Sequence, residues 1–176
     1  MNTNYDIIIV GSGAAGLSAA LYAGRYRTKV LVIAKEFGGE TASAGSIENY
    51  PGVPAIDGYD LMNLMKKQAS ALGVEIVNAE VTAMTRQEHC FEVTTSDAVY
   101  QAHGIIFATG AERRRLGLPN EKELTGKGVH YCVTCDGPVY TGKTIAMVGG
   151  GDASVKGAVL AAEYVNKLFL IGRGKE

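Results

Sequence analysis

The sequence has almost no net charge and no long apolar run, and each shortage excludes a class of protein. Its 17 Lys and Arg residues against 18 Asp and Glu residues leave a formal net charge of −1. That balance gives no electrostatic footprint for nucleic acid or for an anionic membrane surface. Apolar runs such as 7–10 and 105–108 have the length of strands, far short of the ~18 residues that span a bilayer. We therefore expect neither a nucleic-acid partner nor a membrane span.

Cysteine is also scarce. Three cysteines, two of them in one CxxC, do not make the disulfide framework of a secreted protein. A redox-active pair in a reducing compartment fits this count better. Residues 1–4 lack the basic and apolar regions of a secretory signal. We expect a cytoplasmic protein in which Cys90 is an inert strand residue.

What the sequence does contain is a repeated pattern of strand, glycine-rich loop, helix and strand. A composition of 47% apolar and 20% charged residues is typical of a globular protein. The strands and helices expected in the two repeats are 5–10, 14–27 and 29–33, and then 144–148, 152–166 and 167–171. This degenerate repeat predicts an α/β, Rossmann-like fold with two βαβ nucleotide units.

The middle of the chain separates these two units. Residues 34–58 read as a long functional loop, and apolar positions recur at helical spacing over 60–72. Short alternating runs between 74 and 102 predict an antiparallel meander, and 104–108 predicts a buried strand. A polar connection around Pro119 then predicts domains of 1–115 and 116–176.

Both glycine-rich loops follow an apolar strand and open a helix, as in sites for the pyrophosphate of a dinucleotide. The loops are Gly11-Ser12-Gly13-Ala14-Ala15-Gly16 and Gly149-Gly150-Gly151-Asp152-Ala153-Ser154. In GxGxxG the first glycine makes the tight turn, the second lets backbone amides approach the phosphates, and the third allows close helix packing. Ser154 takes the third position of the second loop, where a small residue is tolerated. The helix N-terminus adds N–H donors and a positive dipole end.

Two charged residues extend these loops. Glu36 follows Gly16 by the interval at which a Rossmann site places an acidic residue for the ribose, although it lies past the expected strand end at 33. Arg173, between Gly172 and Gly174, stands where an arginine accommodates a 2′-phosphate, which favours NADP.

The CxxC motif, Cys132-Val133-Thr134-Cys135, is followed directly by Asp136. Two sulfurs at this spacing can close a small disulfide, and a carboxylate beside them can pass a proton during exchange. Zinc is the competing interpretation, because His130 stands two residues before Cys132. A structural zinc site needs four ligands, and the sequence contains neither a second CxxC nor an HxxxH. We expect no metal site, and we expect His130 to be a packing or surface residue, with tuning of the dithiol as the alternative.

Together these motifs give the chain a resemblance to low-molecular-weight thioredoxin reductases, and equally to the flavoprotein subunit of alkyl hydroperoxide reductase. The segments that carry the resemblance are 11–16, 38–39, 47–52, 108–110, 128–138 and 149–154. The resemblance implies FAD/NAD(P)-binding domains of the three-layer ββα type. It places FAD in domain 1–115, and NADPH or NADH in an incomplete domain 116–176 that carries the CxxC.

The resemblance also implies individual roles. The residues that would contact FAD are Gly11, Ser12, Gly13, Ala14, Ala15, Gly16, Glu36, Gly38, Gly39, Glu40, Asn49, Val81, Thr109 and Gly110. Those that would contact NAD(P)H are Gly149, Gly151, Asp152, Ala153, Ser154 and Arg173. Cys135 would face the flavin, Cys132 would attack the substrate disulfide, and Asp136 would be the acid/base. Glu40 replaces the family's usual Gln, so a carboxylate near the flavin would make its reduction harder.

The implied function is that of an FAD-dependent NAD(P)H:protein-disulfide oxidoreductase acting on thioredoxin-like or glutaredoxin-like proteins, homodimeric at full length. Alternatives remain open: an alkyl hydroperoxide reductase type of flavoprotein, or ferredoxin or NADH as the electron donor. A non-catalytic nucleotide-binding fragment is a further alternative, because family members run to roughly twice this length and one domain here is incomplete.

Overall fold

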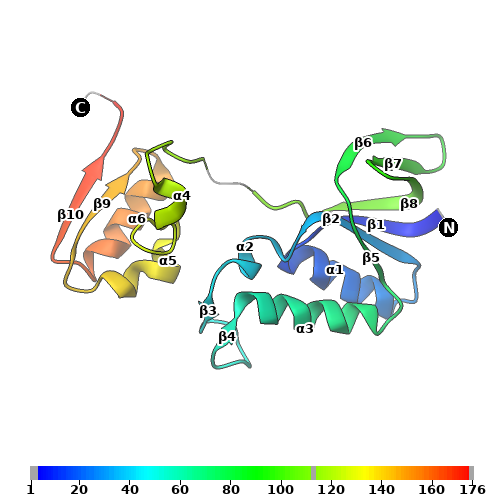
Figure 1. The fold of residues 1–176 in the computed structure, drawn as a ribbon, viewed down its shortest axis with the longest axis horizontal. Coiled ribbons are helices and arrows are strands. Elements are labelled where there is room, and N and C mark those ends of the chain that lie inside the picture. The colour runs from blue at the N-terminus through cyan, green and yellow to red at the C-terminus, as the bar shows by residue number, and fades with distance from the viewer. Residues whose placement is uncertain (1–3, 112–113, 175–176) are drawn as a thin grey trace. The chain divides into compact units, whose positions relative to one another are not determined.

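The computed structural model describes residues 4–111 and 114–174. Its contacts divide the chain into two compact units, residues 1–111 and 112–176 (Figure 1). The division falls a few residues before the boundary predicted between 115 and 116. Most of the N-terminal stretch used to judge a secretory signal, residues 1–3, lies outside the described residues. Within the described residues, no helix is both long and apolar enough to cross a membrane.

The first unit is built on a six-stranded sheet in the order β5-β2-β1-β8-β7-β6. The strands are β1 (Asn4–Ser12), β2 (Val30–Phe37), β5 (Glu75–Asn78), β6 (Val81–Arg86), β7 (Phe91–Thr95) and β8 (Val99–Phe107). β5, β2, β1 and β8 run parallel to their neighbours, whereas β8, β7 and β6 are joined antiparallel. The parallel part carries the first βαβ unit, and the antiparallel part is the meander.

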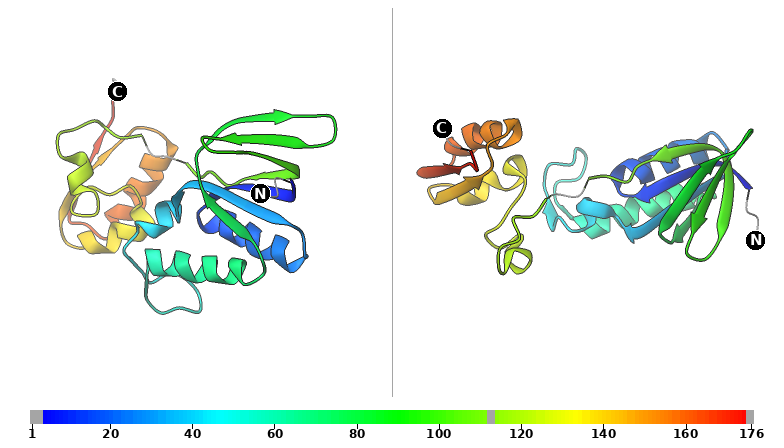
Figure 2. Two further views of the ribbon diagram at one scale, coloured as in Figure 1. Left: turned by 45° about the vertical axis from the view of Figure 1, so that its right-hand side comes forward. Right: turned by 90° about the horizontal axis from the view of Figure 1, so that it is seen from above.

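Three layers form around the parallel strands because successive side chains of a strand point to opposite faces. Ile9 of β1 packs with Ala20 of α1 (Ala14–Arg25) and Ala69 of α3 (Gly58–Ser70). Its neighbour Ile8 packs in a separate buried cluster with Val93 of the meander. Figures 1 and 2 show both helices on one side of the parallel strands and the β6-β7 hairpin on the other. The predicted α/β, three-layer ββα fold is therefore confirmed.

Two strands differ from the sequence prediction. The strands expected at 99–102 and 104–108 are one continuous strand, β8, because Gly104 stays in the ladder opposite Ile7 and does not interrupt it. The run near 75, assigned to the meander, is instead the parallel edge strand β5 beside β2. Alternating apolar residues predict a strand, but its partner is decided by tertiary packing.

Residues 34–58 are also more regular than the predicted loop. β2 runs to Phe37, and a short helix α2 (Gly39–Ala42) follows. Two short antiparallel strands, β3 (Ser46–Ile47) and β4 (Ile56–Asp57), complete the segment. Oδ1 of Asp57 then accepts a 2.9 Å hydrogen bond from the Tyr59 amide and caps α3.

The second unit contains the second βαβ unit. β9 (Thr144–Val148) and β10 (Lys167–Ile171) pair in parallel, as predicted, and are connected by α6 (Asp152–Ala162), which is shorter than the predicted 152–166. Before them come two short helices, α4 (Glu121–Leu124) and α5 (Val133–Asp136), and a 3-10 turn, η1 (Gly137–Tyr140). The CxxC lies at the start of α5.

Candidate functional site

The first glycine-rich loop is a tight strand-to-helix turn. Gly11 has a φ of +111°, and a Cβ there would overlap the carbonyl of Ala108. A Cβ on Gly16 would in turn overlap the carbonyl of Gly11, so α1 packs directly onto the turn. Gly13 is the extended N-cap of α1, whose first turn, containing Ala14 and Ala15, has no acidic residue. The helix therefore presents its N–H groups and positive end without a competing carboxylate, as a pyrophosphate site requires.

The end of β2 lies beside this loop. After an irregularity in the ladder, Ser12 pairs with Phe37, and the hydroxyl of Ser12 donates a 3.2 Å hydrogen bond to the carbonyl of Glu36. The expectation that the strand ends at 33 was wrong, because pairing with β1 resumes beyond this irregularity. Glu36 is thus an exposed strand residue beside the loop, where a carboxylate can accept hydrogen bonds from a ribose.

The two glycines before α2 also approach the loop. Gly38 and Gly39 have φ values of +80° and +55°, a conformation that favours glycine. A Cβ on Gly39 would lie 3.6 Å from the Cα of Gly13. Glu40 follows in the first turn of α2 and is exposed. The structure therefore brings the residues expected to bind pyrophosphate and flavin together.

The remaining residues expected to contact FAD are more scattered. The backbone of Thr109 contacts Gly11, since a Cβ on Gly11 would lie 3.2 Å from the Thr109 amide nitrogen, and Gly110 follows with a φ of +68°. Asn49 is exposed in the connection between β3 and β4. Val81 begins β6 and is a half-buried neighbour of the hydrophobic core. The structure brings Thr109 to the loop, and leaves the contacts expected of Asn49 and Val81 as predictions.

The second glycine-rich loop repeats the turn with a different third residue. Gly149 has a φ of +136°, and a Cβ there would overlap the side chain of Ser154. Its amide donates a 2.8 Å hydrogen bond to the carbonyl of Ile171 at the end of β10. Gly151 is the extended N-cap of α6. Ser154 therefore packs against Gly149, where a side chain at position 149 would both overlap the serine and strain the backbone.

The charged residues near the second loop give a mixed environment for phosphate. Asp152 is the first residue of α6, ahead of Ala153, and it forms a 2.8 Å ion pair with Lys156 one turn later. Arg173 lies exposed after β10. The lysine offsets the negative charge of Asp152 at a helix end that otherwise favours anions.

The redox centre of the second unit is a disulfide between Cys132 and Cys135, whose Cα atoms are 5.3 Å apart. The amide of Asp136 donates a 3.0 Å hydrogen bond to the carbonyl of Cys132. Sγ of Cys132 lies 3.2 Å from Oγ1 of Thr134, which the disulfide leaves as the donor. The sequence prediction of the pair did not identify this hydroxyl. Cys90, in the first unit, is a free thiol.

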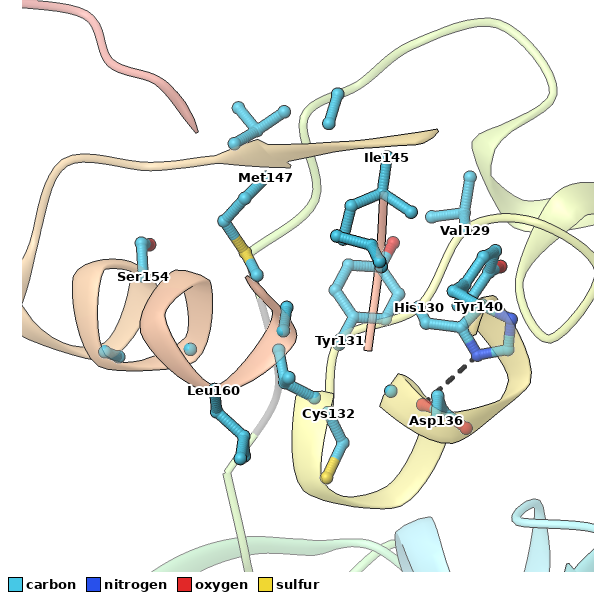
Figure 3. Close-up of a pocket in the computed structure, with 18 of the residues that line it drawn as sticks. Val129, His130, Tyr131, Cys132, Asp136, Tyr140, Ile145, Met147, Ser154 and Leu160 are labelled. Atoms are coloured by element: carbon cyan, nitrogen blue, oxygen red, sulfur yellow. Dashed lines mark ion pairs between the residues drawn. The ribbon is translucent and has the colours of Figure 1, made fainter. Parts of the chain in front are cut away.

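The carboxylate after the disulfide is held by a histidine. Nδ1 of His130 lies 3.1 Å from Oδ2 of Asp136 (Figure 3). The rings of His130 and Tyr140 pack edge to face, with their centroids 5.4 Å apart. Burial, and to a smaller extent the charge of Asp136, raises the pKa of Tyr140. His130 thus packs against Tyr140, as predicted, and also contacts Asp136, whereas tuning of the dithiol stays a prediction. A His and an Asp on either side of the CxxC were the signal in the sequence for this contact.

A buried carboxylate supports this segment and was missed from the sequence. Glu121 is 5% exposed and accepts a 2.7 Å hydrogen bond from the Tyr131 hydroxyl. It also accepts backbone N–H groups of residues 116, 117 and 118 at 3.0, 2.8 and 3.3 Å. The Leu116 amide and then the Tyr131 hydroxyl hold the pKa of Glu121 below its usual range. Glutamate in a polar connection resembles a solvated residue, so only the folded loop identifies it.

The disulfide segment lines a cavity of about 1120 Å³ within the second unit (Figure 3). The polar side chains of its wall include His130, Asp136 and Ser154. The apolar ones include Ile145 and Met147 of β9 and Leu160 of α6. Among the described residues, no group of three His, Cys, Asp or Glu side chains could hold a metal ion.

Comparisons with known proteins agree with this geometry. Residues 5–176 match the model of the family described as pyridine nucleotide-disulphide oxidoreductase. The thioredoxin reductase of Treponema pallidum is 45% identical over 175 residues, which are 98% of this chain and 57% of that protein. The chain therefore spans little more than half the length of this relative.

The chain is also similar to solved structures. The crystal structure of thioredoxin reductase from Streptococcus pyogenes matches with a TM-score of 0.92 at 37% identity, over 100% of this chain and 58% of that one. A ferredoxin-flavin thioredoxin reductase from Clostridium acetobutylicum matches with a TM-score of 0.57 at 33% identity, over 98% of this chain and 61% of that one. The chain belongs to the pyridine nucleotide-disulphide oxidoreductase family.

Proposed function

We propose that this chain contributes the redox centre and the start of both nucleotide sites of an FAD-dependent NAD(P)H:protein-disulfide oxidoreductase. The observation that carries the proposal is the Cys132–Cys135 disulfide followed by Asp136, whose carboxylate is held at 3.1 Å by His130. A disulfide with an adjacent, oriented carboxylate supports thiol–disulfide exchange with proton transfer. Residues 1–115 are the FAD-binding part, and residues 116–176 the start of the NAD(P)H-binding part.

The residues of the first unit fit FAD. Gly11 and Gly16 let the backbone pack tightly at the turn, Gly13 has space at the N-cap of α1 where the pyrophosphate would lie, and Glu36 is exposed for the ribose. Gly38, Gly39 and the side chain of Glu40 lie toward the flavin side in this proposal. When bound, FAD supplies a two-electron carrier between nicotinamide and disulfide. Gly149, Gly151 and Ser154 hold the nicotinamide dinucleotide, with Arg173 for a 2′-phosphate.

The protein's own chemistry is a two-step exchange. The thiolate of Cys132 attacks one sulfur of the substrate disulfide and forms a mixed disulfide, releasing the other substrate sulfur as a thiolate. The thiolate of Cys135 then displaces the second substrate sulfur and restores Cys132–Cys135. The substrate leaves with two electrons and two protons more, and Asp136 carries a proton between the sulfurs and solvent. The substrate is a thioredoxin-like or glutaredoxin-like protein, and the protein acts in the cytoplasm as a homodimer at full length.

The test expresses the full reading frame that contains these residues and adds FAD, NADPH and a thioredoxin. Loss of NADPH absorbance with the appearance of two thiols on thioredoxin supports the proposal, and Cys132→Ser should abolish both. The control Cys90→Ser removes the thiol outside the CxxC and should leave the rate unchanged. Failure of FAD to bind, or NADPH consumption that survives in Cys132→Ser, would contradict it.

A second candidate concerns the electron donor. Arg173, after β10, is flanked by Gly172 and Gly174, and one similar structure is named as a ferredoxin-flavin enzyme. Reduced ferredoxin or NADH would then replace NADPH, including in a peroxide-linked reductase of the alkyl hydroperoxide type. Stopped-flow mixing of the FAD-loaded chain with NADPH, NADH and reduced ferredoxin separates these donors by which one bleaches the flavin.

The third candidate is a nucleotide-binding protein without turnover. It is favoured by the share of the relatives' length that the chain spans, 57% of the Treponema pallidum protein. Isothermal titration with FAD and NADPH tests it. Binding of both without any NADPH-driven reduction of Cys132–Cys135 would favour this candidate over the enzyme.

A further inference from the structure

We propose that His130 is a positioning residue for Asp136 and, through this carboxylate, sets the rate at which the Cys132–Cys135 disulfide exchanges with external thiols. The inference rests on the proposed function for the acid/base role of Asp136. Nδ1 of His130 lies 3.1 Å from Oδ2 of Asp136, as the dashed line in Figure 3 marks. His130 precedes the CxxC and Asp136 follows it, so their contact joins the two ends of the segment that carries the disulfide.

Three links join the two short segments 130–132 and 135–136. They are the disulfide itself, the 3.0 Å hydrogen bond from the Asp136 amide to the Cys132 carbonyl, and the contact between imidazole and carboxylate. The His130 and Asp136 side chains are 19% and 33% exposed. A pair this shielded from solvent is screened less than one on the open surface. The contact with the imidazole therefore restrains the carboxylate next to the disulfide.

The surroundings leave the imidazole as the partner of Asp136. From η1, the Tyr140 ring packs against His130 at an interplanar angle of 81°, and the pKa of the Tyr140 phenol is raised mainly by burial. Tyr140 thus stays neutral. Lys143 lies over the Tyr140 ring at 5.6 Å from its centroid. In the part of the chain that the structure describes, Asp136 forms an ion pair only with His130.

Next to His130 in the sequence, the hydroxyl of Tyr131 donates a 2.7 Å hydrogen bond to Oε1 of Glu121. The neighbouring phenol and carboxyl groups therefore bond to each other. His130 contacts Asp136 directly, with 3.1 Å between Nδ1 and Oδ2.

The chemistry needs an oriented carboxyl group. In reduction by dithiothreitol, one thiolate of the reagent attacks a sulfur of Cys132–Cys135 and the other cysteine leaves as a thiolate. The second thiol of the reagent then displaces the first sulfur. The products are two cysteine thiols and the cyclic disulfide of the reagent, and the two protons of its thiols end on the cysteines. With Oδ2 held by the imidazole, Oδ1 of Asp136 remains to carry a proton to a leaving sulfur.

The test compares two amides at position 130 in the oxidised 176-residue chain. His130→Asn places its amide nitrogen close to where Nδ1 lies, whereas His130→Gln places it nearer Nε2, with similar polarity and similar loss of ring packing. The rate of disulfide reduction by dithiothreitol is measured between pH 5 and 8 without flavin or nicotinamide. We expect His130→Gln to be slower than wild type by about tenfold and His130→Asn by less than about threefold, because general acid–base catalysis contributes about a hundredfold or more.

A double-mutant cycle separates positioning from folding. In the Asp136→Asn background, His130→Gln should change the rate by less than about twofold, and the pH profiles of the two Asp136→Asn chains should coincide. His89→Gln, at an exposed histidine in the first unit, is the matched control and should leave the rate unchanged. Equal rates for the Asn and Gln variants, or an equal effect of His130→Gln in both backgrounds, would overturn the proposal. The assay contains neither nucleotide, so it fails or succeeds independently of the NADPH-driven reaction.

Discussion

The hydroxyl of Tyr131 donates a 2.7 Å hydrogen bond to Oε1 of Glu121, and so ties the residue before Cys132 to a buried carboxylate on α4. The same carboxylate accepts the backbone N–H groups of residues 116–118. One side chain therefore fixes both the polar connection that precedes α4 and the segment that leads into the disulfide.

This relationship predicts an acid dependence. The folded state lowers the pKa of Glu121 from its ordinary value, first through the Leu116 amide and then through the Tyr131 hydroxyl. A carboxyl group with a lowered pKa contributes stability above its unfolded pKa and loses it as the pH falls through the folded value. We expect the amides of 116–118 to be protected from hydrogen exchange at pH 7 and to lose protection in acid, as the pH falls through the lowered pKa of Glu121. Glu121→Gln should remove the protection at pH 7, whereas Glu123→Gln, an exposed neighbour on α4, should not.

The first loop predicts a stability difference between two glycines. Gly11 and Gly73 both have positive φ, +111° and +81°, but only at Gly11 would a Cβ overlap backbone atoms. Gly73→Ala should cost about 1–3 kcal/mol of unfolding free energy, from the strained backbone alone. Gly11→Ala should cost more, because the Ala108 carbonyl must also move. Urea unfolding followed by circular dichroism gives both values, and equal losses would show that the overlap is relieved without cost.

The disulfide predicts a thiol count. In denaturant, the oxidised chain should react with a thiol reagent once, at Cys90, and the reduced chain three times. Cys132→Ser should give two reactive thiols in either state, because Cys135 loses its partner. Mass spectrometry after alkylation assigns the sites. A count that does not rise on reduction would mean that the CxxC is not oxidised in the isolated protein.

Glu40 predicts a shift in the flavin potential. The residue is exposed in the first turn of α2, after two glycines that approach the loop at Gly13. A nearby negative charge disfavours the addition of electrons to a flavin, so Glu40→Gln should raise the midpoint potential of the FAD-loaded chain. A shift of about 30 mV corresponds to a factor of ten in the two-electron equilibrium.

The measurement for this variant is equilibration with a redox dye of known potential. Glu48→Gln, an exposed glutamate in the connection after β3, is the control and should leave the potential unchanged. An unchanged potential in Glu40→Gln would place its carboxylate away from the flavin.

Much of the fold could be predicted because its signals are local. The strands at 5–10 and 144–148 are short apolar runs that end in glycine-rich loops, so each βαβ unit is visible along the chain. The edge position of β5 and the continuity of β8 were not visible, because strand pairing depends on residues far away in sequence. Glu36 shows the same limit, since its strand continues only through renewed pairing with β1.

For the redox centre, the sequence by itself determined the disulfide and its carboxylate: the spacing of Cys132, Cys135 and Asp136 places all three in one turn of chain. Only the tertiary structure decided what holds that carboxylate. His130 reaches Asp136, and Tyr131 reaches Glu121, because the segment folds back on α4 and η1. Residues that are close in the sequence are close in space whatever the fold. A contact between side chains further apart depends on the path of the backbone between them.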